Sequence, residues 1–101
     1  MKDGPIPVKI DPILAELVPT FLERCRQNAV ECREAVRSVD LVAARRIGHA
    51  LHGTASSFGF QEMAEIGRDI EQAARAGDSA ALKNLVERLD GHLSRLQPVY
   101  D

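Results

Sequence analysis

Apolar side chains recur at spacings of three and four residues along most of this chain, and charged side chains fill the positions between them. That spacing is the pattern of a helix with one face in a protein core and the other in water. Five stretches of it follow one another, separated by proline, aspartate or glycine. We therefore expect a chain built of helices, a short one over residues 13–18 and long ones over residues 20–39, 41–58, 61–75 and 79–96.

The residues between the long stretches predict where each helix begins and ends. Asp40 and Asp78 are typical N-cap residues, and Gly59 and Gly77 are typical C-cap residues. Because connections this short make consecutive helices antiparallel neighbours, the pattern predicts an all-α protein, an antiparallel up-down four-helix bundle. The nearly heptad spacing of the apolar residues suits the left-handed packing of such bundles.

The N-terminal stretch is expected to add a short helix over one end of the bundle. Asp11 and Pro12 suit a helix start, and Pro19 is expected to end this helix before the first long one begins. No alternation typical of a strand is present. The domain organisation that follows is an extended arm at residues 1–9, the bundle at residues 10–97 and a tail at residues 98–101.

Composition narrows the function classes. The 101 residues suffice for one domain, and the formal net charge of −2 with scattered cations argues against general nucleic-acid binding. No apolar run approaches the roughly 20 residues that span a bilayer, and no signal-peptide pattern is present. Cys25 and Cys32 lie about 10 Å apart along one helix, too far for a disulfide. We therefore expect free buried thiols and a cytoplasmic protein, and the charged outer faces of the helices favour a monomer.

The third stretch carries the candidate chemistry. His49 lies about 150° around the helix from Leu51, near the centre of the apolar stripe, and is therefore expected to face water. Gly53, one turn later, costs about 1 kcal/mol relative to alanine and leaves one flank of the imidazole open. With Arg45 and Arg46 one turn earlier, this exposed ring is suited to holding an anion or to forming a bond with phosphorus.

The run His49-Ala50-Leu51-His52-Gly53, followed by small residues as far as Gly59, resembles the His-x-Leu-Lys-Gly signature of histidine-containing phosphotransfer (HPt) domains. The resemblance extends from about Ile10 to about Leu96. It implies a four-helix bundle on which a receiver domain docks and transfers the phosphoryl group of its aspartate to the histidine, which later passes it to another receiver. It also implies that the receiver brings Mg²⁺, that this chain binds no cofactor, and that it is a phosphocarrier without kinase activity of its own.

The motif residues can be given roles. His49 is the phosphoryl-accepting nucleophile, with Nε2 as the expected acceptor atom, and Gly53 gives steric access. His52 stands where the family has lysine, and it can support phosphoryl oxygens only as a cation or as a neutral N–H donor. Transfer is therefore expected to depend on pH more than it does with lysine. The residues expected to contribute to binding beside them are Arg45, Arg46 and Ser56.

Two alternatives stay open. A bundle that lacks the family lysine is also suited to docking receivers without accepting phosphate. His49 and His52, with His92 as a third ligand, are suited to binding a metal ion, although His92 belongs to another helix and is also interpreted as a partly buried packing residue. The partners implied by the resemblance are response-regulator receiver domains and a hybrid sensor histidine kinase.

Overall fold

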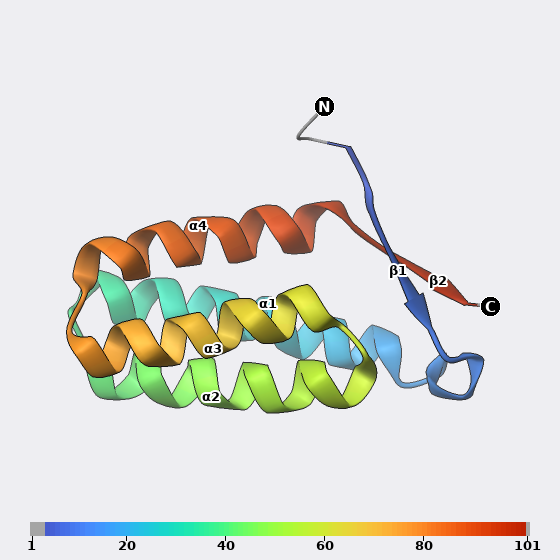
Figure 1. The fold of residues 1–101 in the computed structure, drawn as a ribbon, viewed down its shortest axis with the longest axis horizontal. Helices are drawn as coiled ribbons and strands as arrows, with labels where there is room; N and C mark the ends of the chain where they lie inside the picture. Colours follow the sequence, from blue (N-terminus) through green and yellow to red (C-terminus); the bar gives the residue numbers. More distant parts are fainter. Residues whose placement is uncertain (1–3, 101) are drawn as a thin grey trace.

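The computed structural model describes residues 4–100. Its helices run up and down in turn around one core, as Figure 1 shows, so the prediction of a four-helix bundle is confirmed. No helix in this range is long and apolar enough to cross a membrane. The elements, in chain order, are β1 (Ile6–Ile10), the 3₁₀ turn η1 (Pro12–Leu14), α1 (Val18–Arg37), α2 (Leu41–Phe58), α3 (Gln61–Ala76), α4 (Ser79–Arg95) and β2 (Leu96–Tyr100).

The cap residues act as the sequence predicts. The carboxylates of Asp40 and Asp78 each accept a hydrogen bond, 3.0 Å long, from the backbone N–H three residues on, at the start of α2 and α4. Gly59 and Gly77 end α2 and α3 with φ angles of 83° and 71°, values in the left-handed region that glycine adopts without strain. The tight turns between the helices follow from these four residues.

The predicted short helix before Pro19 is wrong. Only Pro12–Leu14 forms a helical turn there, a 3₁₀ turn capped by Asp11, and α1 already begins at Val18. Pro19 therefore lies in the first turn of α1 instead of ending an earlier helix. The physical reason is that N–H groups in the first turn have no partner within the helix, so a proline there removes no hydrogen bond.

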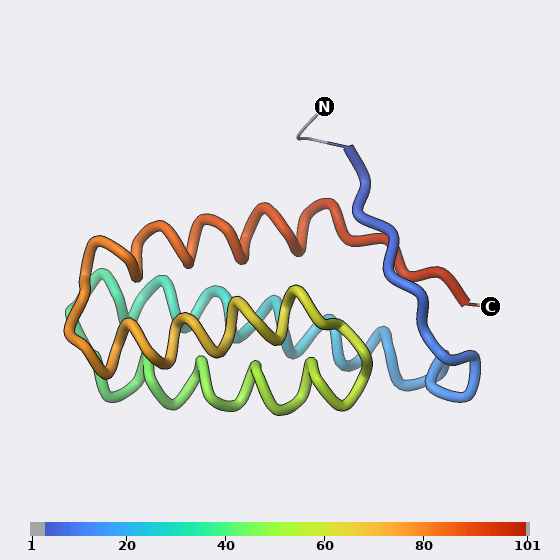
Figure 2. The backbone as a smooth tube through the Cα atoms, in the orientation of Figure 1, coloured from blue at the N-terminus to red at the C-terminus, as the bar shows by residue number. Residues whose placement is uncertain are grey.

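Two short strands also depart from the all-helical prediction. β1 runs parallel to β2, with Ile6 opposite Leu96 and Ile10 opposite Tyr100. Figure 2 shows the two ends of the backbone crossing at the end of the bundle where α1 begins and α4 ends. Ile10 is buried and packs against the core. Parts of the expected arm and tail thus meet in a two-stranded sheet.

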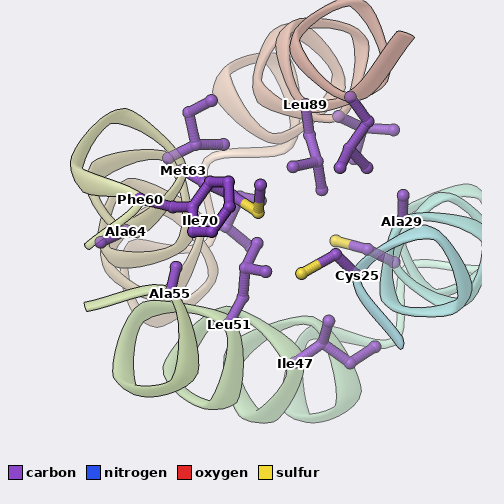
Figure 3. Packing of buried hydrophobic residues seen from close by; sticks show 14 of the residues in the cluster. Cys25, Ala29, Ile47, Leu51, Ala55, Phe60, Met63, Ala64, Ile70 and Leu89 are labelled. Carbon is purple, nitrogen blue, oxygen red and sulfur yellow. The ribbon is translucent and has the colours of Figure 1, made fainter. Parts of the chain in front are cut away.

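The core consists of aliphatic, aromatic and small side chains from all four helices, which Figure 3 shows pointing toward a common centre. Cys25 and Cys32 are buried and free, as the sequence predicts. Burial raises the pKa of the Cys25 thiol to about 12 and that of Cys32 to about 11. Both thiols therefore stay protonated and unreactive near neutral pH.

Two glycines bring α2 and α3 into the most extensive helix contact of the bundle. A Cβ atom at Gly48 would lie 2.7 Å from the backbone oxygen of Gly67, and a Cβ at Gly67 would lie 2.9 Å from the backbone oxygen of Gly48. Neither position has room for a larger residue. This close approach sets the face of α2 that carries His49 directly beside α3.

Candidate functional site

The imidazole of His49 is exposed on the outer face of α2, as the helical pattern predicted. Its side chain is 75% accessible, whereas Leu51 on the opposite face is fully buried. One of its ring nitrogens nevertheless has a partner on α3.

That partner is Glu71, a residue of α3 that the sequence did not single out. Its Oε2 lies 3.2 Å from Nδ1 of His49 and 3.4 Å from a guanidinium nitrogen of Arg75. A carboxylate only accepts hydrogen bonds, so Nδ1 carries the proton and Nε2 keeps its lone pair. The Glu71 side chain is only 16% exposed and is thus held firmly. In the neutral ring, the contact leaves the free lone pair on Nε2.

Gly53 has no packing reason to be glycine. Within residues 4–100, a Cβ atom built there meets nothing within 4 Å, in contrast to Gly48 and Gly67 on the buried side of the helix pair. The residue lies in the interior of a helix, where glycine is costly. Open space one turn after His49 supports the predicted role of Gly53 in access to the imidazole.

His52 is half-buried and fixed in one tautomer. Its Nδ1 lies 3.0 Å from the backbone oxygen of Ala64 on α3, and a carbonyl oxygen can only accept, so Nδ1 is the N–H donor. In the neutral ring Nε2 is therefore a lone pair. The sequence predicts that His52 acts either as a neutral N–H donor or as a cation. The N–H of the neutral ring is already bonded to Ala64, so only the imidazolium has a second N–H that can bind another group.

An open hollow of about 450 Å³ adjoins His49. Three guanidinium groups and one carboxylate border it, and two of the arginines, Arg45 and Arg46, form no ion pair within the described part of the chain. Such an arrangement favours a group with two negative charges. The lining residues are Val42, Arg45, Arg46, His49, Glu71 and Arg75.

Ser56 does not border this hollow. Its hydroxyl donates a hydrogen bond of 2.7 Å to the backbone oxygen of His52 within α2. The side chain is thus folded against its own helix and leaves a low surface. Ser56 is an exposed small residue, and its contacts within the described part of the chain assign it no binding role.

Sequence reasoning missed Glu71 and Arg75 because both belong to the helix opposite His49. They are four residues apart on one face of α3. The signal that would have found them is the pair Gly48 and Gly67, since glycines at matching positions of two antiparallel helices fix which residues lie opposite one another.

The three histidines of the metal alternative are not brought together. His49 and His52 are held by Glu71 and by Ala64, which lie two turns apart on α3. His92 is 2% exposed and borders a separate hollow next to β1. Within residues 4–100, no group of three or more His, Cys, Asp or Glu side chains is placed to hold a metal ion.

Comparison with known families agrees with the motif. Residues 16–98 match the family model of the Hpt domain, a range that contains all four helices and His49. No curated protein and no solved structure gave a match.

Proposed function

Since the chain belongs to the Hpt domain family, we propose that it carries phosphoryl groups between receiver domains of a two-component relay. His49 accepts the group from the phospho-aspartate of one receiver and gives it to the aspartate of another. The observation that carries this role is the contact of 3.2 Å between Nδ1 and Glu71, which leaves the lone pair of an exposed ring on Nε2.

The chemical step uses that lone pair. Nε2 forms a bond to phosphorus while the bond from phosphorus to the aspartyl oxygen breaks, and this oxygen leaves with the electron pair as a carboxylate. The ring then holds a proton on Nδ1 and the phosphoryl group on Nε2, so it is positively charged. The carboxylate of Glu71 stabilises that charge, and the reverse step returns the phosphoryl group to a receiver. We expect Mg²⁺ to come with the receiver.

The protonated form of His52 assists this step as a cation near the phosphoryl oxygens. A neighbouring dianion favours the imidazolium form, and the second N–H of that form lies on Nε2, away from Ala64. His52 in this chain is thus a pH-dependent counterpart of the family lysine.

The alternative function is a bundle that binds receivers without accepting phosphate. Phosphoryl labelling of the chain distinguishes it from this proposal. The natural chain is incubated with phosphorylated receivers from the same organism, and acid-labile, alkali-stable label is expected on it. His49→Gln is expected to take no label, and Lys83→Gln, a control on the exposed face of α4, is expected to keep it. Receiver binding without any label on the natural chain would support the docking-only bundle instead.

We further propose a cytoplasmic monomer, with a hybrid sensor histidine kinase among its partners. Two buried, reduced cysteines suit a reducing compartment. The outer faces of the helices carry charged residues of both signs, which favours solubility as a single copy.

A further inference from the structure

A permanent cation on the flank of His49 that faces His52 would stabilise a phosphoryl group on the ring. The group carries close to two negative charges, and the carboxylate of Glu71 already lies on the other ring nitrogen at 3.2 Å. His52 supplies a charge only when protonated, because its single neutral N–H is bonded to Ala64. At a pH where the imidazole of His52 is neutral, α2 therefore places no cation on this flank.

The two histidine contacts show which part of α3 lies opposite. His52 meets Ala64 and His49 meets Glu71, so the intervening turns of α3 run past the two rings. Arg68 is four residues after Ala64 and three before Glu71. Residues at these spacings share one face of a helix, one turn apart. Arg68 therefore lies in the same row as both contact residues, between them.

The charge of Arg68 is not engaged. It is exposed and forms no hydrogen bond or ion pair within residues 4–100, whereas Arg75 binds Glu71 and Arg88 lies within 4.0 Å of the carboxylates of Glu62 and Asp69. Arg45, Arg46 and Arg75 border the hollow on the other side of His49, away from His52. Arg68 is thus an arginine without a partner at the level of the two histidines.

We propose that Arg68 binds the phosphoryl oxygens of phosphorylated His49 and supplies, from α3, the permanent charge that lysine gives other members of the family from α2. A guanidinium group is suited to this because its paired N–H groups match two oxygens of one phosphoryl group. The inference rests on the proposed function of His49 and adds a residue to it.

The first test measures the transfer rate from a saturating phosphorylated receiver at about pH 8, where imidazole side chains are neutral. Arg68→Gln is expected to slow transfer roughly tenfold, the effect of losing one charge-assisted hydrogen bond. Lys83→Gln, which removes an exposed cation without a partner on α4, is expected to leave the rate unchanged. A natural rate in Arg68→Gln would overturn the proposal.

The second test asks whether Arg68 replaces the lysine. In a His52→Lys background, Arg68→Gln is expected to slow transfer less than about threefold, because the new ammonium group supplies the charge. If Arg68→Gln slowed transfer equally in the natural chain and in His52→Lys, Arg68 would not take the place of the lysine.

A third readout separates charge from folding. In ³¹P spectra of the phosphorylated chain, the second ionisation of the phosphoryl group is expected at higher pH in Arg68→Gln than in the natural chain, because a nearby cation favours the dianion. If the phosphoryl group ionised at the same pH in Arg68→Gln and in the natural chain, Arg68 would not contact it. A natural chain that never takes label would instead refute the function of His49, a different result from any of these.

Discussion

One half-buried carboxylate determines how His49 reacts. Glu71 accepts a hydrogen bond from Nδ1, and in the proposed reaction it neutralises the charge that the ring gains when Nε2 is phosphorylated. Glu71→Ala is expected to lower the transfer rate about tenfold to a hundredfold, since both the tautomer and the orientation of the ring are lost. Glu71→Gln keeps an amide oxygen that accepts from Nδ1 and is expected to lose less. Rates from a phosphorylated receiver, with ¹⁵N shifts of the ring to report the tautomer, check this; unchanged rates in Glu71→Ala would show that the contact is incidental.

The second residue-level prediction concerns pH. An imidazole loses its charge when it gives up a proton, whereas a lysine keeps its charge at neutral pH. The ratio of the natural transfer rate to that of His52→Lys is therefore expected to fall between about pH 6 and 8. Taking the ratio removes the pH dependence that the two proteins share. A ratio independent of pH would exclude a role for the imidazolium.

At the scale of elements, substitutions of the glycines in α2 and α4 distinguish a role in helix packing from a role in access to His49. Gly53→Ala is expected to stabilise the fold by up to about 1 kcal/mol, because open space surrounds the new methyl group, and yet to slow transfer about tenfold by blocking the approach to His49. In Gly91→Ala, the matched control, the new methyl group also meets nothing within 4 Å of the described residues, so similar stabilisation and an unchanged transfer rate are expected.

Gly48→Ala is expected to destabilise the fold by about 1–3 kcal/mol through overpacking. Urea unfolding and transfer rates measure both effects, and a natural rate in Gly53→Ala would contradict the access role.

The helical elements were largely predictable and the contacts across them were not. Apolar spacing and caps at Asp40 and Gly59 are local signals, so the bounds of α2 followed from its own residues. Pro19 was misread because a proline that ends one helix and a proline that begins another have the same local pattern. The strands β1 and β2 depend on pairing between the two ends of the chain, and Glu71 depends on how closely α2 and α3 approach. Neither has a signal within its own segment.

At the scale of the whole molecule, His92 links the stability of the bundle to pH. It is buried on α4 with both ring nitrogens lacking a hydrogen-bond partner among residues 4–100. Burial lowers the pKa of His92; Glu62, whose Oε2 lies 3.7 Å from Nδ1, opposes this, while Arg88 and Arg95 add to it. Lys9 of β1 borders the adjoining hollow.

The sign of the effect follows from the lowered pKa. The unfolded chain takes up the proton near pH 6.5, before the folded chain does, so the free energy of unfolding falls as pH drops below about 6.5 toward the folded pKa. His92→Leu is expected to remove this part of the pH dependence and, if packing is kept, to recover about 1–3 kcal/mol at pH 7 by deleting two unpaired polar atoms. Urea unfolding at about pH 7 and 5.5 measures it. If the stability of the natural chain and of His92→Leu depended equally on pH, a group other than His92 would be responsible.

The pairing of β1 with β2 also determines how the molecule answers to mechanical force. The strands are parallel, so the first residue of one, Ile6, and the last residue of the other, Tyr100, lie at opposite ends of the pair. Tension applied between them pulls the strands along each other and loads the bonds between them together, instead of opening them one after another. We therefore expect the sheet to shield the four helices, so that the surface around His49 keeps its shape until the two strands separate.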